Sequence, residues 1–316
     1  MQTDAQKLVV VRDQFALKGL SDDALKQILP AYKEAMDRLQ YLLRTMPPDG
    51  SIERELWLRT QLATIEAQFR PVADRIYQVL PEAQARAFEE GLTNARKYLE
   101  AGGIRPEPAT ATTTLSSTTM RGKEVSVTGN LPGLNVTSAV EKGFISPSIT
   151  RQQIVAAARE TGFSVLSPGG SKVGVADLLP KWMAAESNQV VRHLRAGFLV
   201  GSTNEEIMRE IGPLARGRKG WAMTEAVVRT SMAEASQSAH DAFYEANEDL
   251  LLPTKSGYRW WWDASNDTRL CPVCAPLDGI KFKERDEPPH PWPAHFSCRC
   301  KILPWTATQE LMEEDG

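Results

Sequence analysis

The sequence predicts a mainly α-helical protein, in which a helical body is followed by a small C-terminal α+β module stapled by zinc. Apolar residues recur at spacings of three and four through much of the chain, which is the period of amphipathic helices. The four cysteines lie together in a C-terminal stretch where side chains alternate as in short strands. A bound metal ion can stabilise such a stretch, which has little core of its own.

Length and composition narrow the class further. The 316 residues are enough for about two folded units, and 42% hydrophobic and 24% charged residues are ordinary for a globular protein. The net charge of −3 argues against a general nucleic-acid-binding protein, which is usually basic, but leaves room for a local basic patch. No apolar run approaches the length of about 20 residues that crosses a bilayer, so we expect no membrane partner.

Residues 1–103 are expected to form an N-terminal helical region with antiparallel helices running up and down. Thr3 or Asp4 can cap a short first helix that ends near Gly19, and Ser21 can cap the next. That second helix has one apolar stripe, formed by Leu25, Ile28, Leu29, Tyr32, Met36, Leu39 and Leu43. We interpret the stripe as core rather than as a ligand groove.

Prolines and glycines divide the rest of this region. Two prolines in the run 46–50 should end the second helix, and Ser51 should start a longer one that Pro71 kinks. Pro81 suits the first turn of a further helix, which we expect to end at Gly102 and Gly103.

Residues 104–147 are rich in Thr, Ser, Pro and Gly, and we interpret them as a linker or extended arm with little helix. Val125 and Val127 alternate as in a strand. Two readings stay open from sequence alone: a disordered connector, and an arm that becomes ordered on a partner.

Residues 148–308 are expected to form a second domain that begins with helices. Thr150 or Ser148 caps the first of them, and Thr203 with Glu206 fits a capping box. A loop is expected over 213–220, followed by one long helix over 221–247.

Short strands are expected after this helix, in a metal module at 258–305. Residues 258–263 and 280–282 have strand character, and Asp278-Gly279 is typical of a hairpin turn. Residues 309–316 carry four acids and no base, which predicts a solvated acidic tail.

The cysteines form two pairs, a C-x₂-C pair and a later C-x-C pair, with a histidine just before the second. Thiolates and imidazoles are the ligands that zinc prefers in tetrahedral sites. The candidate metal ligands are Cys271, Cys274, His295, Cys298 and Cys300. Because C-x-C is tighter than the usual second pair, one of its two cysteines can lie outside the site, with His295 as the fourth ligand. A disulfide or plain buried thiols are the alternatives. The low cysteine content indicates folding in a reducing cytosol.

The motifs of zinc-dependent catalysis are missing from the sequence. A nucleobase deaminase needs H-x-E, and the common metalloprotease motif is H-E-x-x-H; neither occurs here. Enough ligands are present to close the site, and a catalytic zinc keeps one position open. We therefore expect a structural zinc, no catalytic residue and no enzymatic activity.

The same region resembles a known family, the phage Mu F-like minor head proteins, also called phage head morphogenesis proteins. The resemblance rests on D-x-R-x-C-x-x-C at 267–274, L-D-G at 277–279 and P-x-H-x-x-C-R-C at 293–300, in this order. Upstream, Val228-Arg229-Thr230 stands where the family often has A-R-T-E, with Ser231 in place of the glutamate. The resemblance covers about residues 148–305.

This resemblance implies a structural virion protein that acts in head assembly. Family members lie inside the phage head, in contact with the portal protein or the major capsid protein, in several copies. They are made in the host cytoplasm, and the resemblance extends to roles in DNA packaging or ejection and to contact with packaged DNA.

An alternative is a zinc-containing nucleic-acid-binding or nuclease-like module. Arg216, Arg218 and Lys219 make a basic segment with two glycines, which can neutralise phosphates and approach them closely. A solvated loop between helices explains the same segment.

Overall fold

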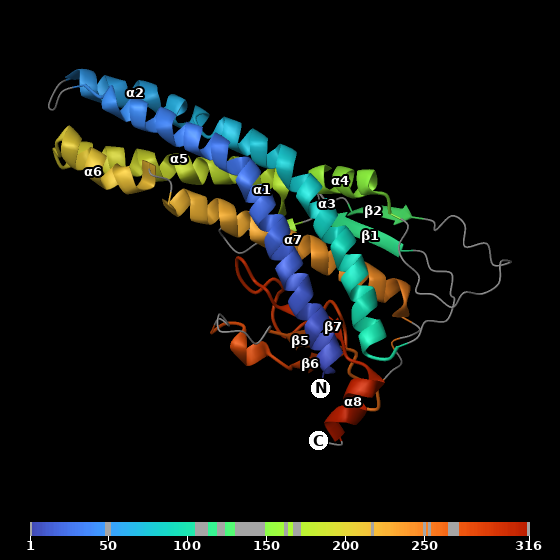
Figure 1. The fold of residues 1–316 in the computed structure, drawn as a ribbon. Helices are drawn as coiled ribbons and strands as arrows, with labels where there is room; N and C mark the ends of the chain where they lie inside the picture. The colour runs from blue at the N-terminus through green and yellow to red at the C-terminus, as the bar shows by residue number, and fades with distance from the viewer. Residues whose placement is uncertain are drawn as a thin grey trace.

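The computed structural model describes residues 2–47, 52–104, 113–118, 124–129, 149–160, 164–166, 172–215, 218–248, 251, 254–264 and 272–314. Long helices form an elongated body, and a small sheet lies against one end of it, close to the N-terminus (Figure 1). The prediction of a mainly α protein with a small C-terminal α+β module is confirmed. Among the described residues, no helix is both long and apolar enough to cross a bilayer.

Three helices make up the N-terminal region: α1 (Asp4–Arg44), α2 (Ile52–Ala67) and α3 (Arg70–Ala101). The chain runs along α1 and returns through α2 and then α3 (Figure 1), which agrees with the expected up-and-down arrangement. The later helices of the body are α4 (Arg151–Glu160), α5 (Val175–Leu199), α6 (Asn204–Ala215) and α7 (Arg218–Ala246). Helix α3 packs mainly against α1 and α7, and these two helices also contact each other directly.

The described residues contain seven short strands in three small sheets. The hairpin of β1 (Thr113–Thr118) and β2 (Glu124–Gly129) contains the strand expected at Val125 and Val127. A second pair joins β3 (Ser164–Leu166) to β4 (Lys172–Gly174). The C-terminal sheet has the antiparallel order β6-β5-β7, with β5 (Trp260–Asp263), β6 (Lys281–Phe282) and β7 (Lys301–Pro304). The chain then ends in α8 (Ala307–Glu314).

Several predicted helix starts are confirmed by their capping bonds. Thr3 accepts a hydrogen bond from the Gln6 backbone N–H in a capping box that opens α1. The Thr150 hydroxyl accepts a bond from the Gln153 backbone N–H at α4. At α6, Thr203 and Glu206 form the expected reciprocal pair.

Four local expectations are wrong. Helix α1 continues through Gly19, and the Ser21 hydroxyl donates to the Leu17 carbonyl inside the helix instead of capping a new one. Pro71 lies in the first turn of α3, while Pro81 lies inside that helix. The loop expected over 213–220 is shorter, because α6 extends to Ala215 and α7 begins at Arg218. Residues 307–314 form α8, in which Gln309 and Glu310 are buried, rather than a solvated tail.

Two hydrophobic clusters fill the interior. The larger one joins the helices of the body along their length. The second surrounds the C-terminal sheet and takes Val10 from α1 and Ala95, Tyr98 and Leu99 from α3, together with Trp260 and Trp262 of β5. The sheet therefore shares its core with the first part of α1 and the last part of α3.

Candidate metal centre

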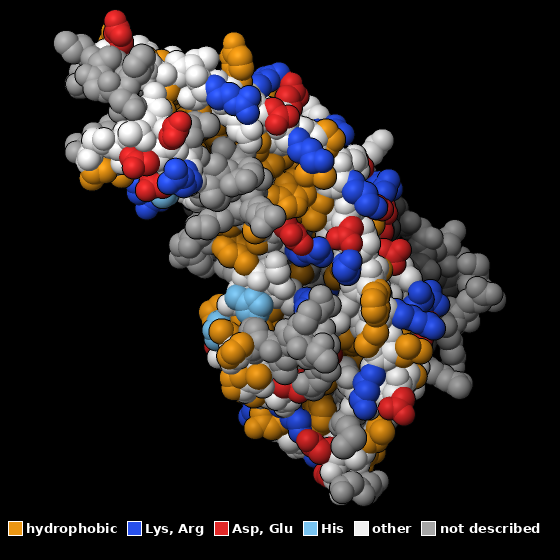
Figure 2. All heavy atoms as spheres, turned by 60° about the vertical axis from the view of Figure 1, so that its left-hand side comes forward, with side chains coloured by type: hydrophobic (Ala, Val, Ile, Leu, Met, Phe, Trp, Pro, Cys, Tyr) orange, Lys and Arg blue, Asp and Glu red, His pale blue; other side chains and the backbone are white. Residues whose placement is uncertain are grey.

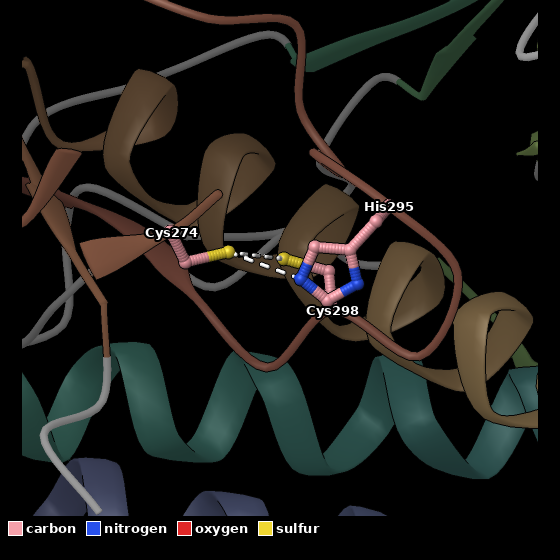
Figure 3. A group of neighbouring side chains, drawn as sticks. All are labelled: Cys274, His295 and Cys298. Carbon is pink, nitrogen blue, oxygen red and sulfur yellow. Dashed lines mark hydrogen bonds between the residues drawn. The ribbon is translucent and has the colours of Figure 1, made fainter. Parts of the chain in front are cut away.

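Three of the predicted ligands come together at the edge of the C-terminal sheet. The Cys274 sulfur lies 3.1 Å from His295 Nε2 and 3.9 Å from the Cys298 sulfur, and the three side chains point toward one another (Figure 3). Two sulfurs bound to one tetrahedral zinc, each at about 2.3 Å, lie about 3.8 Å apart. The distance between the two sulfurs therefore fits a shared zinc ion.

The orientation of His295 suits a metal ligand. Its Nδ1 lies 2.7 Å from the Phe296 carbonyl oxygen, which can only accept a hydrogen bond. Nδ1 therefore carries the proton, and the lone pair of the neutral ring is on Nε2, the nitrogen that faces Cys274. Metal-binding histidines commonly have their other ring nitrogen fixed in this way.

Cys300 lies beside the same group. A hydrogen bond from Cys300 lowers the pKa of the Cys298 thiol, which favours its thiolate form. The hydrogen bond with Cys298, together with burial, raises the pKa of Cys300. A thiolate is the form that binds metal, and Cys300 is placed to lose its proton when a cation enters.

The structure brings together Cys274, His295 and Cys298 and places Cys300 next to them. Cys271 lies outside the described residues. Cys274, Cys298 and Cys300 are free thiols rather than disulfide partners. Four donor groups are thus available among the described residues, enough for a closed tetrahedral site.

The local backbone sets the position of each ligand. Cys274 immediately precedes the 3₁₀ helix η2 (Ala275–Leu277), and its carbonyl accepts a bond from the Leu277 N–H. Cys300 directly precedes β7, and its carbonyl accepts a bond from the buried Trp292 indole. The Cys298 N–H donates to the His295 carbonyl, which closes the turn between these two ligands.

A buried polar cluster connects the helical body to the turn that holds His295, Cys298 and Cys300, called the metal-binding turn below. The cluster is formed by Asp13, Asn94, Ser236, His240 and Lys301. Lys301 Nζ lies 2.7 Å from an Asp13 carboxylate oxygen and donates to the Ser236 hydroxyl at 2.8 Å. Asn94 donates to the other Asp13 oxygen at 2.8 Å. The cluster joins α1, α3, α7 and β7, and its charges are paired as burial requires.

The charges in this cluster shift the ionisation of its members. Burial raises the pKa of Asp13, but Lys301, His240 and the hydrogen bonds of Lys301 and Asn94 outweigh it and bring that pKa below 3.8. Burial and the nearby Lys301 lower the pKa of His240 to about 3. His240 is therefore neutral at physiological pH.

A cavity of about 400 Å³ opens beside the metal-binding turn. It lies between α1 and α7, and its lining includes Phe15, Arg229, Cys298 and Cys300. Cys298 and Cys300 are nevertheless almost completely buried. The cavity gives a route by which an ion can reach the thiols.

Sequence reasoning found the cysteines and the histidine of the candidate metal centre but not the residues that hold them in place. Asp13 and Lys301 are far apart in the chain, and each looks like an ordinary surface charge in the sequence. Thr230 could have been singled out from the sequence, since it belongs to the Val228-Arg229-Thr230 motif. The structure gives it a bond from the Ser297 N–H, next to Cys298.

The predicted basic segment is only partly within the described residues. Arg216 lies outside them, and Arg218 and Lys219 belong to the first turn of α7, where the structure describes the backbone but not their side chains. On the face drawn in Figure 2, described basic and acidic side chains are interspersed over the helical body.

Comparison with protein families identifies the region that contains this site. Residues 188–303 match the family described as phage Mu protein F like protein. This part of the chain is similar to the phage Mu F-like family. The match supports the resemblance seen in the sequence motifs and indicates a phage head morphogenesis protein. Comparisons with curated proteins and with solved structures give no match.

The Mu F-like region contains α6, α7, the C-terminal sheet up to residue 303 and the whole candidate metal centre. It begins within α5 and leaves out α1 and α3. Asp13 and Asn94, which complete the buried polar cluster, therefore lie outside the matched residues.

Proposed function

We propose that this chain is a structural minor capsid protein of a tailed phage, associated with the portal protein or the inner capsid and acting in head assembly. The match of residues 188–303 to the phage Mu F-like family carries the proposal. The arrangement of the candidate ligands agrees with it, since Cys274, His295 and Cys298 lie together and Cys300 is hydrogen-bonded beside them, which favours a closed, structural metal site.

We propose that the metal is zinc and that it has no catalytic role. Zinc would be held by Cys274, His295 and Cys298, with Cys300 as fourth ligand. When bound, it would cross-link the 3₁₀ turn at Cys274 to the turn before β7. The protein would act through the surfaces that this cross-link holds in place, in several copies inside the head. Contact with packaged DNA and a role in its packaging or ejection are part of the same proposal.

Co-expression with the portal protein and the major capsid protein of the same phage tests this function. We expect the full-length chain to co-elute with at least one of the two in size-exclusion chromatography and to be present in purified heads. A matched pair of variants makes the test specific. Cys298→Ser should reduce incorporation, whereas Lys26→Ala, which removes an exposed i,i+3 ion pair, should not. Absence of the chain from heads and from both complexes would refute the proposal.

The nucleic-acid-binding alternative makes a different prediction in the same preparation. DNA binding by Arg216, Arg218 and Lys219 would weaken steeply as salt increases, because each phosphate contact releases counterions. The structure provides no side-chain observation that favours this function over head assembly.

A further inference from the structure

The buried hydroxyl of Thr230 makes two hydrogen bonds with fixed roles. It lies on α7, is 0% exposed and donates to the Ala226 carbonyl at 2.7 Å. The Ser297 N–H approaches the same oxygen at 2.8 Å. A hydroxyl has one proton but two lone pairs. Because its proton points to Ala226, the Thr230 oxygen is left as an acceptor for Ser297.

Ser297 has a backbone conformation that needs support. Its φ of 57° lies in the left-handed region, and among the described residues it alone has a positive φ without being glycine. A side chain makes this region unfavourable by about 1–2 kcal/mol. The bond from Ser297 N–H to Thr230 holds the residue in this conformation, and without it the half-buried Ser297 N–H would lose this partner.

The position of Ser297 decides where two metal ligands lie. It directly precedes Cys298 and follows closely after His295, whose carbonyl accepts the Cys298 N–H. A change of φ at Ser297 would rotate Cys298 away from His295 and Cys274. The other end of the same turn is fixed by Lys301 on Asp13 and by a pair of bonds between Gln237 and Ile302.

We infer that Thr230 is a positioning residue of the metal centre, holding the turn of His295, Cys298 and Cys300 against α7. This inference rests on the proposed structural metal. It has a thermodynamic consequence, because coupling between two sites is reciprocal. If docking of the turn on α7 raises metal affinity, then metal binding strengthens the contact between the module and the helical body by the same factor.

The neighbouring residue provides a matched control. Ser231 is also 0% exposed, also lies on α7 and donates its hydroxyl to a carbonyl within the helix, that of Val227, at 2.8 Å. Ser231→Ala therefore removes a buried hydroxyl from the same helix without removing the bond to the metal-binding turn. Thr230→Val removes the acceptor while keeping the shape of the side chain.

The experiment measures the zinc affinity of the full-length protein by competition with a chromophoric chelator, in reducing buffer at neutral pH. We expect T230V to bind zinc about 10- to 100-fold more weakly than the wild type. T230S, which keeps the acceptor, and S231A should each stay within about threefold. With Co²⁺ in place of zinc, the absorption bands of T230V should shift, and those of S231A should not, because these bands report ligand geometry.

A second variant separates positioning from general damage and covers the case in which T230V folds poorly. Ser297→Gly removes the left-handed penalty, since glycine adopts this region freely. The double variant T230V/S297G should recover part of the lost affinity. Equal affinities of T230V and S231A, or no recovery in the double variant, would overturn the inference. A wild type that binds no zinc would overturn it together with the zinc proposal, while head association is measured independently by co-elution.

Discussion

At the scale of single residues, disruption of the ion pair between Asp13 and Lys301 should cause a large loss of folding stability. Both side chains are almost completely buried, and each makes a second hydrogen bond within the cluster. Removing one partner of a buried pair leaves an uncompensated charge, which commonly costs 3–5 kcal/mol. Replacing both partners with uncharged side chains avoids that penalty.

The residue-scale prediction follows from this asymmetry. Asp13→Asn should lower the free energy of unfolding by about 3–5 kcal/mol, because Lys301 stays buried without a counter-charge. Adding Lys301→Met should recover a large part of the loss. Urea denaturation of the two single variants and the double variant gives the coupling energy. Losses that simply add would contradict a direct interaction between the two side chains.

The candidate ligands could be picked out from sequence because zinc sites leave a local pattern of cysteine and histidine spacing. The residues around them could not, because their partners are set by the tertiary fold. The role of Asp13 as a partner in a buried ion pair depends on the fold, in which β7 brings Lys301 to the first part of α1. That Cys274, His295 and Cys298 lie together also needed the structure, since the spacing alone left the ligand set open.

At the scale of elements, α3 and α7 approach each other closely at Gly91. A Cβ atom built there would lie 2.7 Å from the Ser236 carbonyl oxygen and 2.8 Å from the Ala239 Cβ. The helices meet here because Gly91 has no side chain, and Ser236 at the contact also belongs to the buried polar cluster. This packing sets how α7 presents Thr230 and Gln237 to the metal module.

Two glycine substitutions in helices should therefore have opposite effects. Gly91→Ala should lower the free energy of unfolding by about 1–3 kcal/mol, because the backbone of α7 has to move. Gly19→Ala is the control, since a Cβ at Gly19 meets nothing within 4 Å. It should raise stability by up to about 1 kcal/mol through helix propensity. Thermal unfolding measures the stability change of each variant relative to the wild type. Destabilisation by Gly19→Ala would contradict the account.

The helix pattern could largely be predicted, and the errors have a common cause. Caps at Thr3, Thr150 and Thr203 use contacts within one turn, so they are visible in sequence. In the sequence, Gly19 looks like the end of one helix and Pro81 like the start of another, yet tertiary packing keeps both inside helices. The local cost of about 1 kcal/mol for glycine is smaller than the burial gained on either side of it.

At the scale of the whole molecule, the metal module and the two N-terminal helices α1 and α3 share one core. Val10, Tyr98 and Leu99 belong to the same hydrophobic cluster as Trp262 and the cysteines of the metal-binding turn. The Mu F-like region at 188–303 therefore does not contain all of the residues that its own core requires. The predicted boundary at 104–147 therefore divides the sequence into two regions, but residues from both sides of it pack into one core.

Buried His240 makes stability depend on pH across the acidic range. Its pKa is about 3 in the fold and 6.5 in the unfolded chain, so the unfolded state binds more protons between these values. Stability should fall as pH decreases below 6.5, by about 3 kcal/mol at pH 4 from this residue. Asp13, with its lowered pKa, adds a loss only below about pH 3.8.

His240→Leu provides the check on this pH dependence. The difference in unfolding free energy between wild type and H240L should change steadily between pH 6.5 and pH 4, in favour of the variant at low pH. Urea titrations at intervals across this range, made on both proteins under the same metal conditions, cancel the contribution of the metal ligands in the difference. A difference that stays constant with pH would contradict a buried neutral histidine.

The central claim is that one zinc ion holds the C-terminal module on the helical body. Native mass spectrometry of the full-length protein, with and without a strong chelator, combined with hydrogen exchange, tests it most directly. We expect one zinc per chain, and its removal should increase exchange over residues 258–305 and in the first part of α1. A protein without metal, or one whose exchange is unchanged after the metal is removed, would contradict the claim.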